Sequence, residues 1–350
     1  MNIIQTDIYE ELKGSVLPVV IYGMGNGADK ILNEFSRRSI TVSGITASDD
    51  FVRGQSFHGC TVRKVSDFEK EFGDFIIITA FGTSLPDVMK HIFLLSERHR
   101  LLAVDVPVYG DNIWDRSFYE ENIEDIRRSY DLFADSRSKD VFEKIINYKL
   151  SGDLSYLRSA YSSKDEVFDE ILKFSDTESY LDLGAYRGDT IDELLRYTNG
   201  KYSHITALEP DRKTFSKLKA YAAGMKNIRL YRMGIWSEDR DIGFESSLGR
   251  GSGIRQNSGE KLAVTKIDTL YKRRKLTYLK MDVEGSERQA LLGGINTLRR
   301  DRPKLNIAVY HRSEDIFSIP LLISEICPDY RLYLRQHPYI PAWDLNLYAI

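Results

Sequence analysis

The chain has 350 residues, of which 42% are hydrophobic and 29% charged, and its formal net charge is −3. This length exceeds the roughly 150 residues of a typical domain, so at least two domains are expected. The slight negative charge excludes a general affinity for nucleic acid, and the two distant cysteines, Cys60 and Cys327, exclude a disulfide framework or a cysteine-based zinc motif.

No targeting or membrane-spanning segment is recognisable. The first residues, "MNIIQTDIYEELKG", include acids where a secretory signal would be basic and then apolar. No apolar run approaches the roughly 18 residues that cross a bilayer. We therefore expect a soluble, cytoplasmic protein without membrane insertion.

From residue 17 to about residue 108, β-branched runs alternate with helix-periodic segments. Such alternation indicates parallel strands, so we predict a Rossmann-like domain over residues 1–108. Strand signals then stop, and residues 109–175 show only helical periodicity. This stretch is predicted to be a helical connector, with a helix capped at Ser136 and ended at Gly152.

The alternation of strands and helices restarts at about residue 178, which predicts a third region over residues 176–350. Its last two strand-like runs, "YRLYLRQH" and "DLNLYAI", lie too close together for a crossover helix, so they are expected to form an antiparallel hairpin. In the middle of this region, residues 245–261 are too rich in Gly and Ser for a regular element. The predicted fold class is α/β throughout.

A glycine loop lies in "YLDLGAYRGDT", residues 180–190, between a strand and a helix. Gly184 lets the chain turn, Gly188 lets a ligand approach the backbone, and Asp189 is placed to cap the helix. Asp182 adds a carboxylate at the strand end. Carboxylates repel pyrophosphate and suit a cofactor with sulfonium and ammonium groups, which favours S-adenosylmethionine.

The next strand ends in "ALEPD", where Glu209 can accept hydrogen bonds from both hydroxyls of a ribose. Taken alone, Glu209 is equally an ordinary acid at the end of a strand. Together with the preceding glycine loop, it favours a ribose-binding role.

Residues 178–350 resemble the FkbM-type S-adenosylmethionine-dependent methyltransferases, and "KMDVEGSE" is the most distinctive of the shared motifs. The resemblance implies a class I methyltransferase fold, a seven-stranded sheet that ends in an antiparallel hairpin. It also implies O-methylation, commonly of a sugar or another hydroxylated metabolite. The motifs that carry it are "YLDLGAYRGDT", "ALEPD", "GIWSED", "KIDTL", "YLKMDVEGSERQALLGG" and the closing "YRLYLRQH" and "LNLYAI".

The resemblance also implies roles for individual residues. Glu209 and its neighbour Pro210 would hold the ribose, and Asp282 would lie beside the transferring methyl group. The adenine would lie by Gly234, Ile235 and Trp236, and the methionine end by Asp182, Gly184, Ala185, Tyr186, Gly188, Asp189 and Thr190.

Methyl transfer to a hydroxyl requires in-line alignment and removal of a proton. The candidate bases at strand ends are Asp282, Glu284 and His311, of which the imidazole has the convenient ordinary pKa. A purely structural histidine is the alternative for His311. Asp282 and Glu284 are also an alternative pair of ligands for a divalent metal, but two acids are a narrow basis for one, so no metal is predicted.

The Gly- and Ser-rich stretch, residues 245–261, is predicted to recognise the acceptor, because long loops on a rigid scaffold often carry function. Within it, Arg250, Ser252 and Arg255 are candidates to bind hydroxyls or a phosphate. A surface loop without a ligand is the alternative.

A first glycine loop, "GMGNGA" at residues 23–28, fits the dinucleotide-binding pattern between a strand and a helix. Three interpretations stay open: a nucleotide or sugar-nucleotide module that presents the acceptor, a scaffold without ligand, and a true NAD site. Its candidate residues are Gly23, Gly25, Asn26 and Gly27, with Asp49 near the end of the next strand.

Three functional classes therefore compete. A methyltransferase acting on a small-molecule or glycan acceptor would use the second glycine loop and is favoured. An NAD-dependent oxidoreductase or epimerase of sugar nucleotides would use the first loop, but the terminal hairpin argues against it. A non-catalytic nucleotide-binding protein is the third alternative. The sequence determines neither the acceptor nor the oligomeric state.

Overall fold

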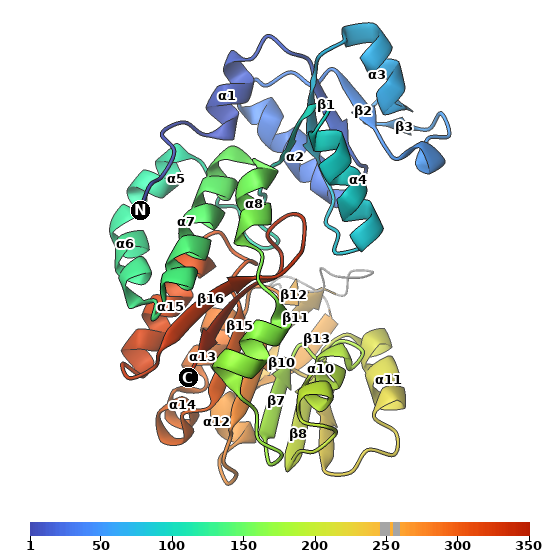
Figure 1. The fold of residues 1–350 in the computed structure, drawn as a ribbon. Helices are drawn as coiled ribbons and strands as arrows, with labels where there is room; N and C mark the ends of the chain where they lie inside the picture. Colours follow the sequence, from blue (N-terminus) through green and yellow to red (C-terminus); the bar gives the residue numbers. More distant parts are fainter. Residues whose placement is uncertain (246–252, 255–259) are drawn as a thin grey trace.

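The computed structural model describes residues 1–245, 253–254 and 260–350 (Figure 1). A six-stranded sheet lies in the N-terminal part of the chain and a seven-stranded sheet in the C-terminal part, with a third, four-stranded sheet beside the latter. The helices that follow the first sheet lie along the side of the molecule (Figure 1). The predicted α/β fold class is confirmed.

The first sheet has the order β3-β4-β2-β1-β5-β6. Its central strand, β1 (Val19–Tyr22), is buried along its whole length and pairs in parallel with β2 (Gly44–Thr46) and β5 (Ile76–Thr79). The remaining elements are α1 (Ile8–Gly14), α2 (Asn26–Arg37), η1 (Asp49–Phe51), β3 (Ser56–Phe57), β4 (Cys60–Arg63), α3 (Val65–Phe72), α4 (Pro86–Ser96) and β6 (Arg100–Ala103).

The helices after the first sheet bury mostly apolar side chains. The longest, α7 (Ser136–Ser151), begins one residue after Asp135, whose carboxylate accepts the Ser138 N–H at 2.7 Å, so Asp135 and not the predicted Ser136 is the N-cap. It ends, as predicted, at Gly152, in the left-handed conformation. The others are α5 (Arg116–Glu121), α6 (Ile123–Leu132), α8 (Leu154–Ala160), α9 (Lys164–Glu166) and the π-helix η2 (Val167–Leu172).

The seven-stranded sheet has the order β16-β17-β15-β14-β7-β8-β9. Its last two strands, β16 (Leu332–Gln336) and β17 (Leu345–Ala349), pair antiparallel, which confirms the predicted hairpin. The other strands are β7 (Ser179–Leu183), β8 (His204–Leu208), β9 (Ile228–Tyr231), β14 (Tyr278–Met281) and β15 (Lys304–Ala308), and the helices are α10 (Asp189–Tyr197), α11 (Arg212–Tyr221), α12 (Ile267–Leu270), α13 (Glu287–Leu292), α14 (Ile295–Asp301) and α15 (Asp315–Ile326).

Part of the stretch expected to be irregular is strand. The chain leaves the large sheet after β9, and Asp239 accepts the Thr265 hydroxyl at 2.7 Å and the Lys266 N–H at 3.0 Å. These bonds connect the turn after β10 to the end of β13. Strand β13 pairs with β10 and β11, and β11 with β12, so these segments form their own four-stranded sheet. Its strands are β10 (Gly234–Ile235), β11 (Arg240–Glu245), β12 (Gly253–Ile254) and β13 (Glu260–Thr265).

The two large sheets are joined by direct contacts. Thr83, after β5, exchanges two backbone hydrogen bonds with Ile340 in the loop between β16 and β17, at 2.7 and 2.9 Å. That loop reaches toward the first sheet (Figure 1). Trp114, fully buried, donates its indole N–H to the Ser313 carbonyl at 3.0 Å. One hydrophobic cluster runs through side chains of both sheets and the helices between them.

Among the helices of the described ranges, none combines the length and the apolar character needed to cross a bilayer.

Candidate active site

The carboxyl ends of β7, β8, β14 and β15 form one edge of the large sheet. The strands are parallel and in register, so Leu183 lies opposite both Leu208 and Met281. The loops that follow these strands therefore start side by side. They carry the second glycine loop, Glu209, Asp282 and His311.

Gly184 is required at the turn after β7. Its φ is +81°, and a Cβ there would lie 1.9 Å from the carbonyl oxygen of Asp282. Its N–H and that of Ala185 donate to the Leu208 carbonyl at 3.1 and 3.0 Å. The turn therefore brings the ends of three strands together, which only a glycine permits.

Gly188 and Asp189 act differently from the prediction. A Cβ on Gly188 would lie 2.4 Å from the ring of Tyr221, so Gly188 makes room for that side chain rather than for a ligand. Helix α10 begins at Asp189, with Gly188 as its N-cap and no capping side chain. Asp189 is thus a residue of the first helical turn, where its charge still favours the helix dipole.

Asp182 is fully buried beneath the glycine loop. Its Oδ2 accepts the Thr190 hydroxyl at 2.5 Å, whereas its Oδ1 has no hydrogen-bond partner in the described part of the chain. Burial raises the pKa of Asp182 to about 6, against the attraction of Lys280 on the neighbouring strand. A buried carboxylate with a free oxygen is costly and suits a cationic ligand.

Glu209 is buried at the end of β8. Its carboxylate accepts two backbone N–H groups, that of Tyr186 at 3.1 Å and that of Asp211 at 2.8 Å. Burial nevertheless raises the pKa of Glu209 to about 7. The two hydrogen bonds hold the carboxylate against the glycine loop, at the position predicted for a ribose-binding acid.

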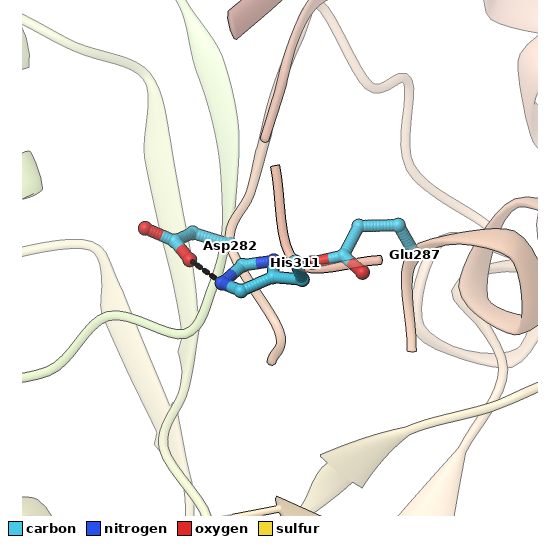
Figure 2. A group of neighbouring side chains, drawn as sticks. All are labelled: Asp282, Glu287 and His311. Atoms are coloured by element: carbon cyan, nitrogen blue, oxygen red, sulfur yellow. Dashed lines mark ion pairs between the residues drawn. The ribbon is translucent and has the colours of Figure 1, made fainter. Parts of the chain in front are cut away.

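His311 lies between two carboxylates, that of Asp282 after β14 and that of Glu287 at the start of α13 (Figure 2). Its Nε2 is 3.2 Å from Asp282 Oδ1 and 3.7 Å from Glu284 Oε2. Its Nδ1 is 2.8 Å from Oε1 of Glu287, which is fully buried and also accepts the Val283 N–H at 2.9 Å. Glu287 was not among the predicted site residues, although it belongs to "KMDVEGSE".

The carboxylates change the charge state of His311. Burial opposes the imidazolium, but Glu287 and Asp282 outweigh burial and raise the pKa of His311 well above its usual value. Burial likewise opposes ionised Asp282, yet Lys280 and His311 hold its pKa below the usual range. The expected role of His311 assumed an ordinary imidazole pKa, whereas the raised pKa of His311 and the lowered pKa of Asp282 favour an imidazolium beside a carboxylate.

Asp282, Glu287 and His311 can also place one ligand atom each within 4.8 Å of the others. This set contains Glu287 in place of Glu284, which with Asp282 forms the alternative metal-binding pair considered from the sequence. A histidine that contacts carboxylates through both ring nitrogens must give up one contact to bind a metal. The positive charge of the His311 imidazolium therefore offsets negative charge of Asp282 and Glu287.

A cavity of about 920 Å³ lies in front of these strand ends and extends to the first glycine loop. Among the predicted residues, Asp182, Ala185 and Gly188 are buried behind its wall, and Trp236 lies outside its lining. The predicted residues that line it are Gly184, Tyr186, Asp189, Thr190, Glu209, Pro210, Gly234, Ile235, Asp282, Glu284 and His311, with Gly25, Asn26 and Gly27 from the first loop.

The first glycine loop is built for packing. A Cβ on Gly27 would lie 2.3 Å from the Ala80 carbonyl oxygen, and one on Gly23 would lie 2.8 Å from the Phe81 ring. Gly25 alone faces open space. Asp49, the predicted ribose acid, is exposed, lies 3.7 Å from Lys64 and does not line the cavity. Among the described residues, Asp49 therefore brings no carboxylate to the cavity beside this loop.

The predicted acceptor residues Arg250, Ser252 and Arg255 lie outside the described residues.

Seven strands with a terminal antiparallel hairpin, and acids at the ends of β7, β8 and β14, define a Rossmann-like methyltransferase domain. Residues 182–341 match the family model of the methyltransferase FkbM domain. The resemblance seen in the sequence is confirmed.

The whole chain is similar in fold to the crystal structure of methyltransferase FkbM from Methylobacillus flagellatus KT, with a TM-score of 0.76, 22% identity and coverage of 99% of this chain and 94% of that one. Fibrillarin from Aeropyrum pernix with bound S-adenosyl-L-methionine covers 55% of this chain and 74% of its own, with a TM-score of 0.34 and 13% identity. An rRNA methylase from Streptococcus thermophilus covers 50% and 87%, with a TM-score of 0.30 and 14% identity. Among curated proteins, none matches the chain.

Proposed function

We propose that the protein is an S-adenosylmethionine-dependent O-methyltransferase that modifies a hydroxyl of a carbohydrate-type metabolite. The methyltransferase class follows from the FkbM domain. The observation that carries the finer proposal is that the second glycine loop, Glu209 and an ionised Asp282 beside His311 border one cavity, with Asp182 buried directly behind that loop.

The acids fit the cofactor. Asp182 has a fully buried carboxylate oxygen without a partner among the described residues, and Glu209 follows the next strand, where a ribose-binding acid is expected. Bound S-adenosylmethionine supplies a methyl group on a sulfonium centre. Asp182 would hold the cationic end of the cofactor, Glu209 the ribose, and the apolar Ile235 the adenine.

Asp282 and His311 suit an oxygen acceptor. A hydroxyl is a weak nucleophile at neutral pH, so a group within hydrogen-bond reach must orient it and take its proton. Asp282 lines the cavity, keeps 36% of its side chain exposed and is ionised. His311 Nε2 holds one of its oxygens, which leaves the carboxylate able to accept a hydrogen bond from an acceptor hydroxyl.

Calorimetry tests the cofactor assignment. S-Adenosylmethionine is titrated into the wild type, into Asp182→Asn and into the matched control Asp49→Asn. We expect binding to the wild type and the control and a loss of at least tenfold in Asp182→Asn, since a charge-assisted contact contributes about 1.5–3 kcal/mol. Equal affinity in all three proteins, or binding of NAD instead, would contradict the proposal.

A further inference from the structure

We propose that the acceptor's sugar ring binds between the two large sheets, against Tyr339 and Trp343 and opposite Phe81 of the N-terminal region. This inference rests on the proposed function, which it deepens by naming the place and the chemical class of the acceptor. All three aromatic residues line the cavity that contains Asp282.

The aromatic wall is held by the N-terminal region. Tyr339 and Trp343 belong to the loop between β16 and β17, and their rings lie 6.1 Å apart at 39°. A Cβ on Gly82 would lie 2.5 Å from the Trp343 ring and 3.2 Å from the Tyr339 ring, so the backbone at Gly82 supports both. The backbone pair of Thr83 and Ile340 fixes the loop from beside Gly82.

Trp343 also has an unused donor. Its indole N–H is buried and has no hydrogen-bond partner within the part of the chain that the structure describes. Buried indole N–H groups usually find a partner, as that of Trp114 does. A ligand hydroxyl at the cavity wall would supply the partner that Trp343 lacks.

The charges of the cavity select an uncharged, hydroxyl-rich ligand. Among the residues that the structure describes, seven carboxylate side chains line it, against three lysines and His311. Such a wall repels phosphate and diphosphate groups, which disfavours the nucleotide-sugar alternative. The sugar hydroxyls donate hydrogen bonds to the Asp344 carboxylate, next to the aromatic pair, and to the amide oxygen of Asn346. The two aromatic rings pack on the apolar C–H face of a pyranose.

The cavity has room for both ligands. Its volume of about 920 Å³ lies near the upper end of the roughly 300–1,000 Å³ of small-molecule sites. Asp282, Tyr310 and His311 line it together with the cofactor loop and the aromatic residues. The N-terminal region is thus a wall of the acceptor site.

Fluorine NMR of protein labelled with 5-fluorotryptophan tests the proposal. The chain has three tryptophans, and Trp343→Phe assigns the resonance of interest, while the fully buried Trp114 is an internal control. Methyl α-D-glucopyranoside and methyl β-D-galactopyranoside are titrated into the full chain with and without S-adenosylhomocysteine. Glucose 6-phosphate is the charged probe and glycerol the polyol without a ring.

We expect a saturable shift of the Trp343 resonance with at least one neutral pyranoside, a much weaker one with glucose 6-phosphate, and none with glycerol. In Trp343→Phe, affinity for that pyranoside, followed by ligand-detected NMR, should fall about tenfold, because one hydrogen bond and part of the ring contact are lost.

Two outcomes would overturn the inference: no pyranoside moves the Trp343 resonance in either cofactor state, or Trp343→Phe keeps full pyranoside affinity while its circular dichroism matches the wild type. Binding of S-adenosylhomocysteine is measured separately by calorimetry. Its failure would remove the proposed function, and because pyranosides are also titrated without cofactor, the sugar site is tested in either case.

Discussion

The two glycine loops of the chain open onto one cavity but differ in their surroundings. At the second loop, the buried carboxylates of Asp182 and Glu209 lie behind and beside the turn. At the first loop, the predicted acid Asp49 is exposed and does not line the cavity. The comparison teaches that the shape of a glycine loop indicates a ligand site only when the charges around it match a ligand.

The glycines themselves also differ. Gly184 joins the ends of three strands, with a backbone oxygen where its Cβ would be. Gly25 has a positive φ but open space around it. At Gly184, the second loop is therefore tightly packed against the neighbouring strand end. The first loop is tightly packed at Gly23 and Gly27 but not at Gly25.

The largest effect is expected from Gly184→Ala. Left-handed backbone strain costs about 1–3 kcal/mol and overpacking about 1–3 kcal/mol, so we expect a loss of about 4 kcal/mol in the free energy of unfolding. The measurement is urea denaturation followed by circular dichroism. Gly25→Ala is the matched control and should lose only about 1 kcal/mol, since it adds strain without a clash. Equal losses of unfolding free energy in the two variants would contradict the inferred difference in packing between Gly184 and Gly25.

Asp182→Asn should stabilise the ligand-free protein while it removes cofactor binding. Burial raises the folded pKa of Asp182 to about 6 from an ordinary 3.8, so the folded state favours the protonated form. Protonated Asp182 therefore stabilises the folded state below the unfolded pKa of 3.8, and this contribution is lost as the pH rises through about 6. At pH 7.5 the neutral amide should therefore gain up to about 3 kcal/mol, at 1.36 kcal/mol per pKa unit.

Thermal unfolding at pH 7.5 and at pH 4 measures this difference. The Tm of Asp182→Asn should exceed that of the wild type at pH 7.5 and approach it at pH 4. A lower Tm for Asp182→Asn at pH 7.5 would show that Asp182 is stabilised by contacts within the protein. Its role as a cofactor ligand would then lose its physical basis.

Glu287→Gln should change His311 while leaving the cofactor loop intact. Loss of the carboxylate 2.8 Å from Nδ1 removes the first of the attractions that raise the His311 pKa, so this pKa should fall by about 1–3 units. Imidazole resonances of histidine-labelled protein give the pKa directly. Glu284→Gln is the control, because the Glu284 carboxylate lies farther away, at 3.7 Å, and is less buried.

The same variant should alter the pH dependence of stability. A raised folded pKa means that the imidazolium stabilises the folded state fully below its unfolded pKa of about 6.5 and loses this effect as pH rises through the folded pKa. In Glu287→Gln the loss should occur at lower pH, with a destabilisation of about 2 kcal/mol where the wild-type imidazolium is charged. An unchanged His311 pKa would show that Asp282 alone sets its charge.

The sequence was sufficient for the features that depend on neighbours along the chain. Alternating periodicity predicted the parallel sheets, and the short spacing of the last two runs predicted the β16–β17 hairpin, which the structure confirms. The positions of Asp182 and Glu209 near the carboxyl ends of β7 and β8 could be predicted, because they follow directly from the strand pattern.

Features made by distant segments could not be predicted in this way. The raised pKa of His311 depends on Glu287, 24 positions earlier, and the support of Trp343 by Gly82 crosses most of the chain. Strands β10 and β12 have two residues each, too few for a recognisable period. Of the missed features, only Glu287 had a signal in the sequence, as the last acid of the motif "KMDVEGSE".

The smallest effect is expected from Asp49→Asn. Its ion pair with Lys64 spans 3.7 Å between largely exposed side chains, and such pairs contribute about 0–1 kcal/mol. The free energy of unfolding should therefore stay within about 0.5 kcal/mol of the wild type. NAD should raise the Tm of neither protein, because Asp49 does not line the cavity where a ribose would bind. A rise in Tm with NAD that Asp49→Asn abolishes would restore the dinucleotide interpretation of the first loop and show that this acid turns inward when a ligand arrives.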